Sequence, residues 1–158
     1  MANEKTNVMR LLEQQKIMYK KHSYLHSRAV SGEDVARALA QDMNTVYKTL
    51  LTKSRTGHHY VFMIPVQETL DLRKAAKAVG EKSIEMIKEK ELLPLTGYVH
   101  GGCSPIGMKK KFPTVIDARA KTLVNIFFSA GKIGYQVKLH MEDLERILAY
   151  TFADVIAE

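Results

Sequence analysis

The chain has 158 residues, of which 46% are hydrophobic and 26% are charged, which is ordinary for one globular domain with a buried core. One cysteine excludes an internal disulfide framework, the N-terminus lacks an apolar signal-peptide core, and no apolar run reaches the ~18 residues that span a bilayer. We therefore expect a single cytoplasmic domain over residues 1–158. The net charge of +7 favours a polyanionic partner, nucleic acid first.

The hydrophobic patterns predict helices and strands without a regular βαβ alternation. In the first part of the chain we expect a helix over 5–15, a strand over 17–24, a helix capped by Ser31, a strand over 46–53, a turn at Thr56-Gly57 and a strand over 59–66. In the second part we expect a helix from Asp71 to Gly80, a helix over 87–92 ended by Pro94 and irregular structure over 97–107. Strands over 115–117, 124–129 and 135–140, an amphipathic helix over 142–150 and a short strand at Val155 and Ile156 follow. Hairpins between helices predict an α+β fold with a mixed, mainly antiparallel sheet.

Lys48 is the unusual residue of the strand expected over 46–53, because it stands in the mostly apolar segment VYKTLL. Strand alternation places Val46, Lys48 and Leu50 on one face. The lysine either lies near a sheet edge and extends its ammonium group to water, or it points into a pocket and binds an anion. These six residues by themselves favour the first interpretation.

Residues 97–111, GYVHGGCSPIGMKKK, combine glycines with three lysines. The segment matches neither a Walker loop nor a dinucleotide fingerprint. The spacing Gly101-x-x-x-Pro105 predicts a tight loop whose amides could hold a carbonyl or an oxyanion, and a purely structural turn is an equal alternative. The lysines that follow are either a solvated loop or phosphate contacts.

No catalytic or metal-binding constellation is evident elsewhere. Cys103 and the nearby His100 lack an orienting third group. The histidines, at 22, 26, 58, 59, 100 and 140, show no metal-ligand spacing. Ser129, in the segment SAGK, belongs either to a turn between strands or to a pocket rim. We therefore expect no metal and no cofactor.

Seven segments together resemble the YbaK family of aminoacyl-tRNA editing proteins, which is related to the insertion domain of bacterial prolyl-tRNA synthetases. In family order they are TNVMRLL, YKTLL, LDLRKAAKAVG, TGYVHGGCSPIGMKK, PTVIDARA, SAGK and DLERIL, and they cover nearly the whole chain. The resemblance is greater to the free-standing members that act on Cys-tRNA(Pro) than to the free-standing alanine editors. Two departures are Ile133, where arginine is usual, and Tyr47, where phenylalanine is common.

The resemblance implies a barrel-like, largely antiparallel mixed sheet ringed by helices. It implies a deacylase that acts on the 3′ end of mischarged tRNA without metal or cofactor, with prolyl-tRNA synthetase as a possible partner. The substrate's own thiol is expected to attack its carbonyl, so that Cys103 has no part. An editor of Ala-tRNA(Pro) or another small amino acid, a non-catalytic tRNA-binding or regulatory module, and a protein that docks on a synthetase–tRNA complex are the alternatives.

The resemblance also implies roles for particular residues. Catalysis is assigned to Lys48 and Gly101; substrate binding to Tyr24, Gly102, Ser104, Pro105 and Ser129; and tRNA binding to Lys109, Lys110, Lys111 and Lys132.

Overall fold

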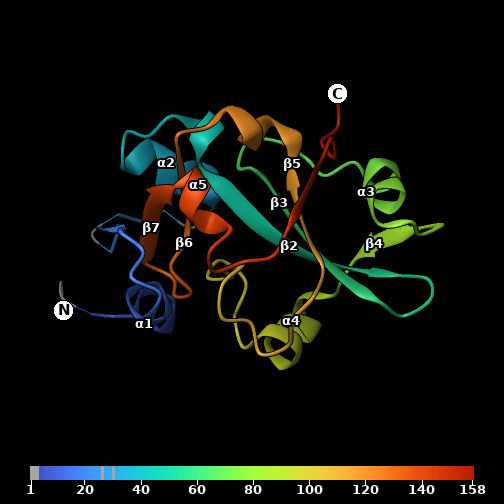
Figure 1. Cartoon of the computed structure of the whole chain (residues 1–158), viewed down its shortest axis with the longest axis horizontal. Coiled ribbons are helices and arrows are strands. Elements are labelled where there is room, and N and C mark those ends of the chain that lie inside the picture. Colours follow the sequence, from blue (N-terminus) through green and yellow to red (C-terminus); the bar gives the residue numbers. More distant parts are fainter. Residues whose placement is uncertain (1–3, 26, 30) are drawn as a thin grey trace.

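Two β-sheets with helices packed around them make up the fold (Figure 1). The structure is a computed structural model that describes residues 4–25, 27–29 and 31–158. Within those residues the helices are α1 (Asn7–Gln14), α2 (Gly32–Ala38), α3 (Leu72–Val79), α4 (Glu89–Thr96), α5 (Met141–Leu144) and the 3-10 turns η1 (Met43–Thr45) and η2 (Ala118–Thr122). The strands are β1 (Lys20–Ser23), β2 (Tyr47–Ser54), β3 (His59–Pro65), β4 (Ile84–Met86), β5 (Thr114–Asp117), β6 (Asn125–Ser129), β7 (Tyr135–His140) and β8 (Thr151–Ala153).

The strand orders are β1-β7-β6 in the smaller sheet and β4-β2-β3-β5-β8 in the larger one. A parallel bridge between Val46 and Phe127 joins the two sheets. Four strand pairings are antiparallel, whereas β3–β5 and β5–β8 are parallel. The prediction of an α+β fold with a mixed, mostly antiparallel sheet is confirmed, although in the described part of the chain the sheets do not close into a barrel.

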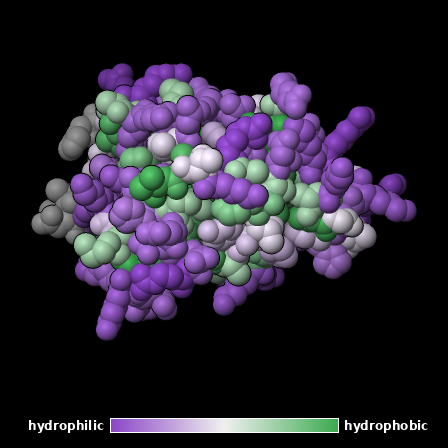
Figure 2. Space-filling model, turned by 45° about the horizontal axis from the view of Figure 1, so that its top comes forward, coloured by the Kyte–Doolittle hydropathy of each residue, from purple (hydrophilic) through white to green (hydrophobic). Residues whose placement is uncertain are grey.

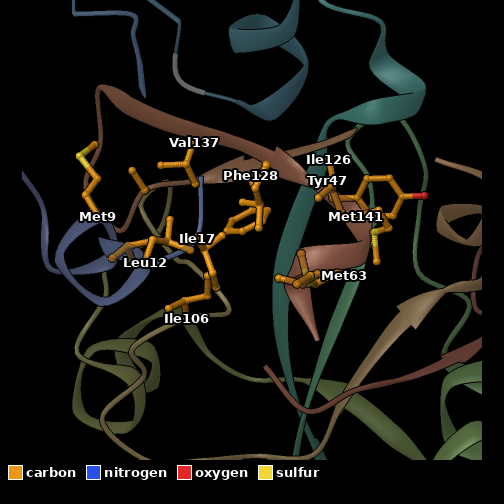
Figure 3. Close-up of a cluster of buried hydrophobic side chains, with 14 of the residues drawn as sticks. Met9, Leu12, Ile17, Tyr47, Met63, Ile106, Ile126, Phe128, Val137 and Met141 are labelled. Atoms are coloured by element: carbon orange, nitrogen blue, oxygen red, sulfur yellow. The ribbon is translucent and has the colours of Figure 1, made fainter. Parts of the chain in front are cut away.

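The main hydrophobic core lies between α1 and the sheet β1-β7-β6 and extends to Tyr47 and Met63 of the larger sheet and to Met141 of α5 (Figure 3). Met9 and Leu12 of α1 pack with Phe128 and Val137, and all four are at most 1% exposed. Burying each such side chain contributes roughly 2 kcal/mol. The helix begins two residues later than expected, at Asn7, because the Thr6 hydroxyl caps it by accepting a hydrogen bond from the Met9 amide.

A second core lies under α3, where Ala75 and Ala76 pack with Phe62 and Ile64 of β3. The carboxylate of Asp71 caps α3 by accepting hydrogen bonds from two amides of its first turn. Away from these cores, hydrophilic residues cover much of the face drawn in Figure 2, with hydrophobic ones gathered across its middle. In the described residues, no helix has the length and apolar character needed to cross a membrane.

The prediction that Pro94 ends a helix is wrong, since α4 continues to Thr96. Proline removes the hydrogen bond to the carbonyl four residues earlier, that of Lys90. Lys90 is exposed, so water can satisfy that carbonyl. The last turn is closed by hydrogen bonds from the Thr96 hydroxyl to the Leu92 carbonyl (2.7 Å) and from the Gly97 amide to the Leu93 carbonyl (2.8 Å).

The C-terminal predictions are also wrong in their bounds. The helix expected over 142–150 is α5, which ends at Leu144 and continues as turns, and the final strand is β8 rather than Val155 and Ile156. The chain must be extended by Thr151, because β8 pairs there with β5. Ile156 forms only an isolated bridge with Leu70.

Asp117 holds the end of β5 to the C-terminal segment. Its fully buried carboxylate accepts hydrogen bonds from the amides of Arg119 and Val155, both at 3.2 Å, and pairs with the Arg119 guanidinium at 3.1 Å. We expect Asp117→Ala to lower the free energy of unfolding by about 2 kcal/mol. The Arg119 amide loses its capping carboxylate, and the buried Val155 amide loses its hydrogen-bond acceptor. Urea unfolding measures this loss.

The control for that prediction is Asp154→Ala, which removes an exposed carboxylate that also pairs with Arg119. It should destabilise the protein less than Asp117→Ala. An unchanged unfolding midpoint for Asp117→Ala would show that the buried carboxylate does not stabilise this corner of the fold.

Candidate functional site

A cavity of about 490 Å³ opens between the start of α2, the first half of β2, the 97–107 loop and the strands β6 and β7. Four predicted site residues line it: Tyr24, Lys48, Gly101 and Ser129. Its walls are otherwise rich in apolar side chains, among them Val35, Leu92 and Phe128. Apolar walls with a few polar groups are typical of small-ligand sites.

The cavity exists because β2 is paired on one side along only part of its length. On the β3 side all residues from Tyr47 to Lys53 are paired, whereas β4 pairs only with Thr52–Ser54. The first half of β2 is therefore a local sheet edge that faces the cavity. Lys48 lies at an edge, as the first interpretation holds, and it lines a pocket, as the second holds.

Lys48 presents an ammonium group that no described residue contacts by a hydrogen bond or an ion pair. In the described part of the chain its Nζ makes no hydrogen bond and no ion pair within 4.0 Å. Partial burial lowers the pKa of its ammonium group below the ordinary lysine value, and the carboxylates of Glu33 and Glu68 partly offset this. A partly desolvated cation without a counter-ion is suited to bind an anion.

The 97–107 loop contributes Gly101 and Cys103 to the lining of the cavity. Gly101 adopts φ = +89°, a conformation that side-chain-bearing residues rarely adopt. No described residue accepts a hydrogen bond from the amides of Gly101 and Cys103, which both line the cavity. Two open amides of this kind can stabilise a carbonyl oxygen on which negative charge develops.

The other predicted loop residues do not line the cavity. Gly102 donates its amide to the Val99 carbonyl at 3.0 Å, and an added Cβ would lie only 3.1 Å from the Ile133 nitrogen. Ser104 is fully buried, and its hydroxyl accepts a hydrogen bond from the Ile106 amide. Pro105 lines a second cavity, of about 310 Å³. These residues shape the loop that carries Gly101.

Tyr24 and Ser129 approach the cavity from the smaller sheet. Tyr24 follows β1, is 7% exposed, and donates its amide to the Gly134 carbonyl at 2.9 Å. Ser129 ends β6, and its hydroxyl accepts a hydrogen bond from the Gly131 amide at 3.1 Å. Both positions are thus anchored by the turn that joins β6 to β7.

The predicted tRNA-binding lysines lie outside this cavity. Lys109, Lys110 and Lys111 are exposed and form no ion pair with a described residue, and the last two line the second cavity. Lys132 is exposed too, but pairs with Glu4 at 2.6 Å. The three consecutive lysines are therefore more available to bind an anion than Lys132 is.

Cys103 is not placed as a nucleophile. Burial raises the pKa of its thiol to about 12, so the thiolate is scarce at neutral pH. His100 also lines the cavity, without a hydrogen bond to Cys103. The described residues contain no group of three or more His, Cys, Asp or Glu side chains that could hold a metal ion, and His26 lies outside those residues.

Glu33, Thr49 and Gln136 are further polar residues that line the cavity. The buried Thr49 hydroxyl has no hydrogen-bond partner among the described residues. Gln136 and Gln41 exchange two amide hydrogen bonds, at 2.7 and 3.0 Å, which tie β7 to the turn after α2. No local pattern signals such a pair, since its members are 95 residues apart.

Comparison with known sequences gives consistent matches. The family model described as "Aminoacyl-tRNA editing domain" matches residues 26–147. The chain is 42% identical over 155 residues, 98% of this chain and 94% of the other, to an Enterococcus faecalis protein named "Putative Cys-tRNA(Pro)/Cys-tRNA(Cys) deacylase EbsC". It is 27% identical to part of a proline–tRNA ligase of Pelobacter propionicus, over 63% of this chain but only 17% of the ligase.

The fold also matches solved structures. One is described as "a putative trans-editing enzyme for prolyl tRNA synthetase", with a TM-score of 0.82, 19% identity, and coverage of 98% of this chain and 100% of the other. Another, "hypothetical protein APE2540", has a TM-score of 0.85 at 18% identity and covers 95% and 99% of the two chains. At these identities the likeness concerns the fold alone.

Proposed function

Since the chain belongs to the family of aminoacyl-tRNA editing domains, we propose that it is an aminoacyl-tRNA deacylase that clears mischarged Cys-tRNA(Pro). The observation that carries this proposal is one cavity lined both by Lys48 and by Gly101 and Cys103, whose ammonium group and amides make no hydrogen bond to a described residue. The name of the Enterococcus faecalis relative supports the choice of cysteine. Residues 1–158 are taken to act as one editing domain, since that relative matches 98% of the chain.

Lys48 and the loop amides have separate roles in the proposed reaction. The Lys48 ammonium group binds a phosphate or ribose oxygen of the terminal nucleotide, which places the ester inside the cavity. The amides of Gly101 and Cys103 hold the ester carbonyl oxygen as charge develops on it. Tyr24 and Ser129 line the remaining walls.

The proposed bond-breaking step uses the substrate's own thiol. Its sulfur attacks the ester carbonyl carbon, the bond to the ribose oxygen breaks, and that oxygen takes up the proton lost by the thiol. The products are free tRNA and a cyclic thioester of cysteine, which water opens afterwards. This route is of the lyase type, whereas direct attack of water on the ester is hydrolysis.

The tRNA body is proposed to dock on the lysines that follow the loop. Lys109, Lys110 and Lys111 are free to contact backbone phosphates, and Lys132 must exchange its partner Glu4 for one. Prolyl-tRNA synthetase is proposed as a partner that adds selectivity for the tRNA. A pull-down of this chain with the synthetase and tRNA should recover all three, and absence of the ternary complex would count against that partner.

The test of the function is deacylation of Cys-tRNA(Pro) alongside Ala-, Ser- and Pro-tRNA(Pro). Rapid release of cysteine with serine retained would support the thiol-assisted step, because serine differs in the attacking atom. Release of alanine would favour the editor of small amino acids. That alternative is close, because a methyl-sized difference between two substrates changes their relative binding free energy by only about 1–3 kcal/mol. Tight binding without any release would leave a non-catalytic tRNA-binding module.

We expect Cys103→Ala to retain near-wild-type kcat/KM for Cys-tRNA(Pro). The thiol packs beside two hydrophobic clusters and its raised pKa disfavours the thiolate, so the chemistry does not need it. Kinetics at saturating and limiting substrate measure this. A loss of about 100-fold in a folded variant would instead identify Cys103 as a nucleophile.

A further inference from the structure

Glu33 brings a negative charge to the wall of the cavity that holds Lys48. It lies in the first turn of α2, which the Ser31 hydroxyl caps by accepting a hydrogen bond from the Asp34 amide at 3.1 Å. A Cβ added at Gly32 would lie 2.5 Å from Cγ1 of Val66. Glycine therefore lets α2 pack against the end of β3, which sets Glu33 beside the start of β2.

The charges of Glu33 and Lys48 act on each other without forming an ion pair. No nitrogen–oxygen distance between them is 4.0 Å or less. Even so, Glu33 is the stronger of the two carboxylates that raise the pKa of Lys48, ahead of Glu68. Both charged groups thus remain available to a ligand that enters between them.

Arg37 does not remove the charge of Glu33 from the cavity. The two pair at 3.2 Å, with 61% of the arginine side chain and 39% of the glutamate side chain exposed. An exposed pair of this kind contributes about 0–1 kcal/mol, so a ligand cation can compete with it.

We propose that the carboxylate of Glu33 binds the α-ammonium group of the esterified amino acid, so that the cavity selects aminoacyl-tRNA with a free amino group. This proposal rests on the proposed function. Among the described residues that line the cavity, Glu33 and Lys48 are the only Asp, Glu, Lys or Arg residues. The 3′ end of an aminoacyl-tRNA carries one cation beside the ester carbonyl and one anion on the terminal nucleotide, which complements that pair.

An acyl group on the amino nitrogen turns the cation into a neutral amide. Glu33 then loses its ligand partner and is still shielded from water by the bound substrate, which costs binding energy. The cavity should therefore reject N-acylated and peptidyl-tRNA, which are chemically esters of the same kind.

Binding of stable substrate analogues tests this proposal. Cysteine is linked through an amide to 3′-amino-3′-deoxyadenosine 5′-phosphate, with the α-amino group either free or acetylated, and titrated calorimetrically into the wild type, Glu33→Gln and Glu68→Gln. The wild type should prefer the free amine by about tenfold or more. Glu33→Gln should abolish this preference by weakening the free-amine analogue alone.

Glu68→Gln is the matched control, because Glu68 also acts on the charge of Lys48 but does not line the cavity. It should keep the full preference. Equal affinities of the wild type for the two analogues, or an equal loss of both affinities in Glu33→Gln, would overturn the proposal. Lack of tRNA turnover together with Glu33-dependent binding would refute the deacylase instead.

Discussion

Replacing Lys48 with alanine is expected to lower kcat/KM for Cys-tRNA(Pro) by about 100-fold, which corresponds to about 2.7 kcal/mol. The ammonium group is the cation that positions the terminal nucleotide, and alanine cannot replace it. Because Nζ has no protein partner among the described residues, the free energy of unfolding should change little. Single-turnover deacylation and thermal unfolding measure the two effects.

Two further variants separate the charge of Lys48 from its packing and its location. Lys48→Met keeps most of the aliphatic stem and should lose as much activity as alanine. Lys53→Ala removes a lysine from the same strand, whose ammonium group pairs with Glu85 and Glu91 at 3.9 and 3.5 Å outside the cavity. It should retain activity, and equal losses for Lys48→Ala and Lys53→Ala would mean that general positive charge matters rather than the site.

Gly101→Ala is expected to lower kcat/KM by about 10- to 100-fold. The cause is a change in the backbone conformation of the loop, not the space that the added methyl group takes up. An added Cβ would meet nothing closer than 3.7 Å, to Ile133. Its cost arises from φ = +89°, where an L-residue is strained by about 1–2 kcal/mol. The loop is expected to relieve this strain by turning its amides away from the carbonyl position.

The matched control for this prediction is Gly57→Ala in the β2–β3 turn. Gly57 also has φ = +89°, and a Cβ there would have no neighbour within 4 Å. It should lose similar stability in urea unfolding and no activity. Full activity of Gly101→Ala would show that the loop amides do not take part in the reaction.

Local chemistry made much of this protein predictable. Residue type and spacing alone predict the caps at Ser31 and Asp71. A hydroxyl or carboxylate just before an apolar helical stripe can accept hydrogen bonds from the first amides of the helix. The hairpin of β2 and β3 followed in the same way from two apolar runs around Thr56-Gly57. The family resemblance, carried by motifs in order, is confirmed over residues 26–147.

The bounds of α5 and β8 depended on partners far away in the chain. An amphipathic pattern favours helix through residue 150, but pairing of β8 with β5 stabilises an extended chain from Thr151. Long-range pairing of this kind leaves no local signal in the sequence.

The candidate site, too, is predictable from the sequence only in part. The unusual lysine and the glycine-rich loop could be recognised as candidates, because a charge among apolar residues and a run of glycines are both locally unfavourable. That Lys48 faces open space depends on how far β4 extends along β2, and that Glu33 stands near it depends on how closely Gly32 approaches Val66. Cavities are formed between elements, so their lining is decided by tertiary packing, which residue spacing along one strand or loop does not encode.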